Sequence, residues 1–324
     1  MIKKLIKSLL GEKNTDTLRR IKYSFSAAKA TWQNFNATQS HKDRLNLSLL
    51  MSIHSLEKAM VIGSTKSLSA FKYDRLISDM SSLIHMGVSP NDFTIAVSAS
   101  VIHSALDTLS GHDDEKSWLS SLVSQYNIPM NLRGGIEVIP STEILRHTDF
   151  DFHAFVSSRH SVRKFKDKII PREVIYDIVR EALYCPSACN RQPFNVYFSE
   201  DKETIARIIC AVPDQFIAGG FHDCLIVTCD RALLNQNETD DQEYINGGIF
   251  LGYMAISIHA HGLGACICQL LRKDRRQEKI KREFGIKDSE IIAGFIAFGE
   301  LEDDVICACS QRRATEDVAL CLDD

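Results

Sequence analysis

The chain lacks the features that mark metal-binding and secreted proteins. None of its ten cysteines forms a C-x-x-C pair, so no zinc-type spacing is present and we expect no bound metal. Most of the cysteines lie inside apolar runs, as Cys224 and Cys229 do in "CLIVTCD", which indicates reduced thiols acting as small hydrophobes. In the first residues, "MIKKLIKSLLG", Lys7 interrupts the apolar stretch and no cleavage site follows. We therefore expect a cytoplasmic protein.

An excess of positive charge is also absent. The 38 lysines and arginines are outnumbered by 42 aspartates and glutamates, which gives a formal net charge of −4. A general nucleic-acid binder normally carries a basic field, and the sequence has neither interleaved aromatic and basic residues nor a helix-turn-helix or zinc-finger pattern. We expect no nucleic-acid partner.

Only one long run has no charged residue, "NGGIFLGYMAISIHAHGLGACICQLL" at 246–271. It is long enough to span a bilayer. However, His259, His261, Gln269 and several glycines interrupt it, and "HGLG" is typical of a helix end. We expect a buried helix followed by a buried strand, and no transmembrane segment.

At 324 residues the chain is long enough for about two structural units. We expect a mainly helical N-terminal region at 1–148 and a second domain at 149–324. Residues 1–35 form a basic arm with eight lysines and arginines against two acids. Its apolar side chains have helical spacing, which favours either a helix packed on its own domain or a weak contact with a membrane surface or partner: Ile2, Leu5, Ile6 and Leu9.

Residues 43–128 have the apolar spacing of helices. One helix has readable ends, because Ser89 is a good N-cap, Pro90 suits the first helical position and Gly111 suits the position after the last turn. We expect a loop-rich linker near 128–148.

The second half alternates helices with strands. The pattern predicts helices at 171–184, 202–212, 241–261 and 275–285, and strands at 194–199, 224–229, 265–271 and 291–299. Alternation of this kind indicates a sheet covered by helices, and pattern alone favours a parallel, doubly wound sheet.

Two polar clusters flank the helix 171–184. "SSRHSVRKF", 157–165, precedes it, and "CPSACNRQPF", 185–194, follows it. Arginines in the first cluster can make charge-assisted bonds to a phosphate, whereas the serine and amides of the second suit the edge of a heteroaromatic ring. Pro186 and Pro193 stiffen the second loop. The alternative is that these residues cap helices and coat a surface.

In order and spacing, these segments resemble the signature of the nitroreductase family. That signature runs R-x-S-x-R-x-F, then Ile-Pro and an apolar helix, then P-S-x-x-N-x-Q-P and an aromatic residue. Further matches are the long apolar helix ending in "GLG", the strand "GFIAFGE" and the basic segment "SQRRATEDV". The resemblance covers about 150–324 and implies an α+β fold, with a mixed sheet flanked by helices.

The resemblance implies that FMN is the cofactor. Arg159, His160 and Ser161 would hold its phosphate and ribityl chain, and Arg163 belongs to the same motif. Arg312 would close on the phosphate from the C-terminal segment.

The resemblance also implies which residues contact the flavin ring of FMN. Pro186, Ser187, Asn190 and Gln192 would line the isoalloxazine ring of the partner subunit's site, because family members build two sites across a homodimer interface. The turn Gly262–Leu263–Gly264 would bring backbone close to the ring, where glycine permits approach.

By this resemblance the protein is an oxidoreductase that transfers hydride from NAD(P)H through FMN to a small electron-poor acceptor, by a ping-pong mechanism. The flavin carries the chemistry, so no side-chain nucleophile or general base is required. His259 and His261 are expected to be core residues, and Cys189 a packing residue without redox activity.

Two alternatives remain. The protein is a dedicated flavin oxidase or dehydrogenase for a biosynthetic intermediate, with the N-terminal region recognising the substrate, or it is a flavin-binding interaction module. "HSLEKAM", 54–60, resembles a His-x-x-Glu-Lys motif that precedes nitroreductase domains in some bacterial proteins associated with surface-polysaccharide genes. It also reads as an ordinary exposed helix face.

Overall fold

The computed structural model describes residues 40–63, 68–131, 134–212, 223–234, 241–270 and 276–322. The basic arm expected at 1–35 lies outside these ranges. Within the described ranges, no helix is long and apolar enough to cross a membrane.

The first half forms a bundle of helices, as its apolar spacing predicts. The helices are α2 (His41–Ile62), α4 (Tyr73–His85), α5 (Phe93–Asp107) and α6 (Asp113–Tyr126). Ser40 begins α2 with a capping box, in which its hydroxyl accepts from the Asp43 N–H while the Asp43 carboxylate accepts from the Ser40 N–H. The apolar faces of the four helices share one core, which includes Leu49, Leu56, Met80, Leu83 and Ile102.

The predicted ends of α5 are wrong. Asp92, not Ser89, is the N-cap, since its carboxylate accepts the N–H of Thr94 at 2.9 Å. Ser89 instead accepts the N–H of Asn91, so Ser-Pro makes a turn before the helix. The helix ends at Asp107, and Gly111 adopts its positive φ of 79° in the loop beyond.

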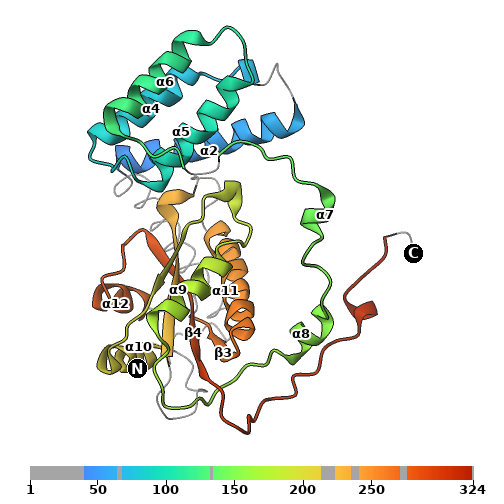
Figure 1. Ribbon diagram of the computed structural model, residues 1–324. Helices are drawn as coiled ribbons and strands as arrows, with labels where there is room; N and C mark the ends of the chain where they lie inside the picture. Colours follow the sequence, from blue (N-terminus) through green and yellow to red (C-terminus); the bar gives the residue numbers. More distant parts are fainter. Residues whose placement is uncertain are drawn as a thin grey trace, which may run out of the picture.

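Two short helices lie between the bundle and the sheet. These are α7 (Ser141–Ile144) and α8 (Phe152–Ser158), and they follow an extended path along one side of the molecule (Figure 1). The carboxylate of Asp151 caps α8 by accepting the N–H of Ala154. The path leads away from the bundle and brings the end of α8 to the edge of the sheet.

The second half is built on a four-stranded sheet of order β1-β2-β4-β3. The strands are β1 (Phe194–Tyr197), β2 (Asp223–Asp230), β3 (Leu263–Cys268) and β4 (Glu290–Glu300). All three strand pairings are antiparallel. The one parallel contact among the described residues is an isolated bridge between Ser161 and Ala265.

The pattern-based expectation of a parallel sheet is therefore wrong, and the α+β fold class is confirmed. The helix α11 (Gln242–Ala260) joins β2 to β3, and both strands run antiparallel to β4, so they are parallel to each other. However, β4, the last strand in the chain, lies between them. This pairing joins segments distant in sequence, which local periodicity does not report.

Helices cover both faces of the sheet. α9 (Arg172–Ala182) and α11 pack on one face, where Ile178, Phe250 and Ile258 contact Val227 and Ile296. On the other face, α10 (Lys202–Ala211) and α12 (Arg276–Glu283) pack against alternate residues of the same strands. β2 is buried along its whole length, and burial on both sides explains the continuous apolar run at its centre, Cys224–Val227.

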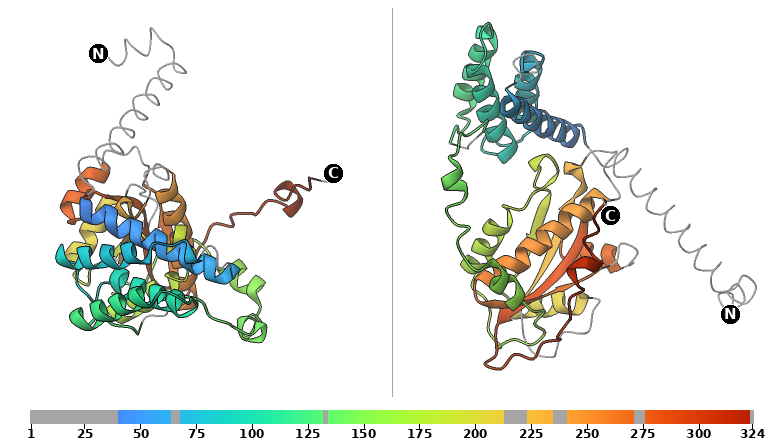
Figure 2. Two further views of the ribbon diagram at one scale, coloured as in Figure 1. Left: turned by 90° about the horizontal axis from the view of Figure 1, so that it is seen from above. Right: turned by 90° about the vertical axis from the view of Figure 1, so that its right-hand side faces the viewer.

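The bundle lies on one end of the sheet-containing half (Figures 1 and 2). Helix α2 packs against two short 3-10 turns, η2 (Ala188–Asn190) and η3 (Arg231–Leu233). Leu233 packs against the bundle core. The η2 turn belongs to the loop "CPSACNRQPF", so the bundle contacts the loop that sequence analysis assigned to a ligand.

A buried acid gives the fold a pH dependence. Asp223 is 2% exposed, and its carboxylate accepts the N–H of Ile170 at 2.7 Å. Burial raises the pKa of Asp223 to about 6. The folded state therefore retains a proton that the unfolded chain releases near pH 4, so the free energy of unfolding falls as pH rises from about 4 to 6. The pKa difference corresponds to about 3 kcal/mol at most.

We predict that Asp223→Asn removes this part of the pH dependence, because the amide oxygen still accepts the Ile170 N–H but does not ionise. Urea unfolding at pH 4.5 and pH 7 measures the effect. The variant should gain stability relative to the unmodified chain at pH 7 and little at pH 4.5. Equal stability differences at the two pH values would contradict the assignment.

Candidate functional site

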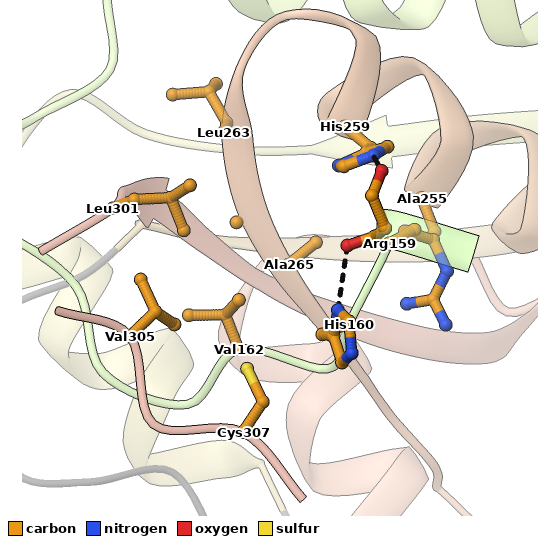
Figure 3. Close-up of a pocket in the computed structure, with 12 residues that line it drawn as sticks. Arg159, His160, Val162, Ala255, His259, Leu263, Ala265, Leu301, Val305 and Cys307 are labelled. Atoms are coloured by element: carbon orange, nitrogen blue, oxygen red, sulfur yellow. Dashed lines mark hydrogen bonds between the residues drawn. The ribbon is translucent and has the colours of Figure 1, made fainter. Parts of the chain in front are cut away.

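A pocket lies where the end of α8, the end of α11, the start of β3 and the chain after β4 meet (Figure 3). Its volume is about 330 Å³. It is lined by Ser158, Arg159, His160, Val162, Ala255, His259, Leu263, Gly264, Ala265, Leu301, Val305 and Cys307. Four of these belong to the predicted phosphate and turn motifs: Arg159, His160, Leu263 and Gly264.

A backbone contact assembles this pocket. Ser161 forms the parallel bridge to Ala265, and the Val162 N–H donates to the Ala265 carbonyl at 3.0 Å. The segment that follows α8, called the edge segment below, thereby lies beside β3 without forming a strand of its own. Arg159 and His160 are carried to the pocket, whereas Ser161 is exposed and is not among the residues that line it.

The glycines of the predicted turn act differently from expectation. A Cβ at Gly264 would lie 2.7 Å from Leu301 Cδ2 and 2.9 Å from Val162 Cβ, so protein side chains already fill the space left by this glycine. Gly262 has a φ of 72°, which forms the turn between α11 and β3, and nothing lies within 4 Å of its Cβ position. Of the two glycines, Gly262 is the one with open space beside it.

The polar wall of the pocket is organised by Ser158. Its hydroxyl donates to the Phe155 carbonyl at 2.9 Å and lies 2.9 Å from His259 Nε2, and its carbonyl lies 2.7 Å from His160 Nδ1. The Phe155 ring packs on the His259 ring with centroids 5.0 Å apart. Ser158 was not predicted for the site, and His259 was predicted to be a core residue. The available signal was the position of His259 in the last turn of the predicted helix, just before the "GLG" turn.

A ladder of ion pairs fixes the rest of the edge segment. Lys164 pairs with Glu302, Lys166 with Asp303 and Lys168 with Glu300, at 2.9, 2.9 and 2.5 Å. The hydrogen bond to Asp303 and the charge of that carboxylate raise the pKa of Lys166. These pairs tie the segment to the chain that leaves β4. Arg163 does not line the pocket, and its guanidinium donates to the Ser161 carbonyl at 3.1 Å.

The loop at 185–194 has an unusual backbone. Cys189, Asn190 and Gln192 have φ values of 51°, 49° and 47°, which residues other than glycine rarely adopt. The Ser187 hydroxyl accepts the Gln192 N–H at 3.1 Å and so closes the loop, but it does not cap the η2 turn that follows it. Pro186 and Asn190 are exposed. Such backbone strain persists where the surrounding structure imposes it, often at ligand sites.

The structure does not bring this loop to the pocket within one chain. The Ala188 N–H donates to Asn246 Oδ1 at 3.3 Å near the start of α11, whereas His259 lines the pocket at its end. Asn246 and His259 are thirteen positions apart, which corresponds to about 20 Å along a helix. The two predicted clusters therefore lie toward opposite ends of α11.

Arg312 lies outside the pocket as well. It belongs to the exposed C-terminal tail, which runs outward from the sheet (Figures 1 and 2), and its guanidinium donates to the Ser310 carbonyl. The tail nevertheless contributes Val305 and Cys307 to the pocket wall. The tail thus begins at the site and then leaves the body of the chain.

The cysteines are free thiols. Burial raises the pKa of Cys185, Cys224 and Cys229, which keeps these thiols protonated and unreactive. In the part of the chain that the structure describes, no three His, Cys, Asp or Glu side chains are grouped closely enough to hold a metal ion.

Comparison with known proteins shows similarity to one family. Residues 156–237 match the sequence model of the nitroreductase family. A protein of Methanothermobacter thermautotrophicus, provisionally named an NADH dehydrogenase/NAD(P)H nitroreductase, is 27% identical over 150 residues, which are 44% of this chain and 74% of that protein.

Two solved structures are also similar. The first is an FMN-dependent nitroreductase of Clostridium difficile, at 20% identity and a TM-score of 0.41, with 49% of this chain and 92% of that chain covered. The second is a provisionally named nitroreductase of Desulfovibrio desulfuricans in complex with FMN, at 19% identity and a TM-score of 0.45, with 53% and 96% covered.

We predict that Gly264→Ala destabilises the fold by about 1–3 kcal/mol, because the added methyl group overlaps Val162 and Leu301. Thermal unfolding measures the loss. Ile267→Val, on the exposed side of the same strand, is the matched control and should change stability by less than about 0.5 kcal/mol. Equal melting temperatures for Gly264→Ala and the control would show that the pocket wall is not packed as described.

Proposed function

We propose that this chain, a member of the nitroreductase family by its residues 156–237, is an FMN-dependent oxidoreductase. It transfers hydride from NAD(P)H to a small electron-poor acceptor in two half-reactions, and the donor leaves before the acceptor binds. The observation that carries the proposal is the pocket itself, where the R-x-S motif and the "GLG" turn meet although about 100 residues separate them. The expected domains at 1–148 and 149–324 and a cytoplasmic location belong to the same proposal.

The residues present fit the phosphate end of FMN. Arg159 supplies a permanently charged guanidinium and His160 a further polar group of the lining, and the exposed Ser161 hydroxyl follows them in the chain. None of the twelve described residues that line the pocket is acidic. The opposite wall is apolar, from Val162, Leu263, Ala265, Leu301 and Val305, and suits the uncharged part of a ligand.

A second copy of the chain would complete the site. The proposed homodimer places the partner's loop 185–194 against the flavin ring, which one chain does not do. Two exposed apolar surfaces support it. One is on α11, where Ile245 and Ile256 are 53% and 40% exposed, and the other is the tail, where Ile306 and Leu322 are 96% and 99% exposed. In that dimer the tail also brings Arg312 toward a phosphate.

When bound, FMN would supply the two-electron chemistry. The chain's own residues then have simpler tasks. Arg159 and His160 bind and orient the phosphate, the apolar wall excludes water, and the loop with Ser187 and Asn190 offers polar groups to the ring edge. This division requires no side-chain nucleophile or general base.

A more specialised form of this activity is favoured by one contact. Helix α2 of the bundle packs against η2, within the loop proposed to face the flavin ring. The bundle therefore lies where an acceptor would approach. On this second candidate function the protein is a dedicated flavin oxidase or dehydrogenase, and the bundle recognises its substrate.

We predict that the purified protein carries or takes up FMN and that anaerobic NADH or NADPH bleaches the flavin absorbance. A yellow protein that neither nucleotide bleaches would favour the dedicated oxidase or dehydrogenase. A colourless protein that FMN does not reconstitute would contradict the proposed function.

We predict that Arg159→Ala and Arg312→Ala each weaken FMN binding at least tenfold, because each removes a charge partner of the phosphate. Quenching of FMN fluorescence measures the affinity. Riboflavin, which lacks the phosphate, is the matched ligand, and its affinity should not change. Arg146→Ala is the matched variant, since Arg146 pairs with Glu143 in the linker. Undiminished FMN affinity in either test variant would overturn that residue's assignment.

A further inference from the structure

The chain between the bundle and the sheet carries apolar side chains that its own chain does not cover. We call residues 136–156 the connecting arm; it includes α7 and most of α8 (Figure 1). Its large apolar side chains are between 37% and 94% exposed: Ile136, Val138, Ile139, Leu145, Phe150, Phe152 and Val156. None of these seven belongs to a hydrophobic core of the described residues. Single exposed apolar residues are normal on a surface, but a group of this density marks an interaction surface.

The connecting arm is fixed at both ends. At the bundle, the Gly134 N–H donates to the Ser100 hydroxyl at 3.0 Å, and a Cβ at Gly134 would lie 2.6 Å from the Val101 nitrogen. At the sheet, the Val162 N–H donates to the Ala265 carbonyl at 3.0 Å. These two contacts set the course of the arm along the side of the molecule, and the apolar side chains lie between them.

The second helix of the arm needs support that one chain does not give. α8 has seven residues, none of which is buried, and a helix this short is not stable in water without packing. The Phe150 ring packs edge-on against the rings of Phe152 and Phe155, with centroids 5.9 and 6.3 Å apart. Phe150 and Phe152 nevertheless remain 56% and 57% exposed. We therefore expect a further surface to cover these rings.

Other exposed apolar side chains gather on the same side of the molecule. Among the described residues, 26 large apolar side chains are exposed, and 16 of them belong to the connecting arm, α11 and the tail after β4. The arm and the tail both project from the side on which α11 lies (Figures 1 and 2). At roughly 100 Å² each, these side chains exceed the ~800 Å² that one partner contributes to a standard interface.

A second copy of the chain fits this surface. It carries the same arm and the same α11, so in a two-fold dimer each copy gives its arm and receives the arm of its partner. The surface is also continuous with α11 and the tail, on which the proposed homodimer already rests.

We propose that the connecting arm is a clasp between two copies of the chain. The arm of each copy packs its apolar side chains on the α11 side of the other, which covers Val138 and Phe152 and stabilises α8. The inference goes beyond the proposed function, which assigns no role to the arm, and shares with it only the second copy.

Charged substitutions in the arm test the clasp. Val138→Asp and Phe152→Asp should each raise the dissociation constant of the dimer at least tenfold, because each places a carboxylate in an apolar contact. Sedimentation velocity over a dilution series of the full chain measures the constant. An unchanged constant in both variants would overturn the proposal.

Phe93→Asp is the matched control for Phe152→Asp. Phe93 and Phe152 are each the first residue of a helix, each follows an aspartate N-cap, and they are 47% and 57% exposed. Phe93 lies in the bundle, outside the connecting arm, so Phe93→Asp should leave the dissociation constant of the dimer unchanged. An equal rise in Phe93→Asp and Phe152→Asp would contradict the clasp.

A second test uses the unmodified protein. Chymotrypsin cleaves after leucine and aromatic residues, so cleavage after Leu145, Phe150 and Phe152 reports whether the arm is covered. Cleavage in the arm, identified by mass spectrometry, should be at least tenfold slower in the dimer than after dilution to the monomer. A model peptide calibrates the protease at each dilution.

The outcomes separate this inference from the proposed function. If the dimer binds FMN but its arm is cleaved as fast as that of the monomer, the clasp fails and the proposed function stands. If the arm is protected in the dimer but FMN does not bind, the proposed function fails and the clasp stands. A chain that stays monomeric at every concentration contradicts both the clasp and the proposed homodimer.

Discussion

The backbone hydrogen bond from the Val162 N–H to the Ala265 carbonyl joins the edge segment to the sheet, and the site depends on this contact. It lays the residues after α8 beside β3, at the point where α11 ends. Gly264 permits the contact, because Val162 and Leu301 occupy the space of a side chain there. Without the bridge, the residues between α8 and the three ion pairs, Arg159 and His160 among them, would have no backbone contact with the sheet.

The length of α11 explains why one chain holds only part of the proposed flavin site. The start of the helix supports the strained loop through Asn246, and its end supports the pocket through His259. A rigid helix keeps these ends apart, so the proposed homodimer would supply the ring side from a second chain. The bundle contacts the same loop through α2, and this contact is what the second candidate function rests on.

Much of this structure follows from local sequence signals. The helices α9 and α11 and the strands β2 and β4 were predicted within a few residues, because their apolar spacing reflects burial directly. The strand directions were not predicted, because pairing between segments distant in sequence places β4 between β2 and β3. Arg159 and His160 were predicted for the site because they belong to one local motif. The contact between Ser158 and His259 was not predicted, because it joins residues that are 101 positions apart. Ser89 alone was predicted to cap α5, and the structure gives that place to Asp92, a residue type that caps helices as well as serine does.

The central claim is that each flavin site takes its phosphate side from one chain and its ring side from another. Heterodimers of an Arg159→Ala chain with an Asn190→Trp chain test it most directly, because Asn190 is exposed and a bulky side chain there would block the ring without entering the core. If sites form across the interface, one site of each heterodimer carries both changes and the other carries neither. We expect one bound FMN per heterodimer, with almost none in either homodimer. Loss of FMN from the heterodimer as well would show that each site is built within one chain and would contradict this account.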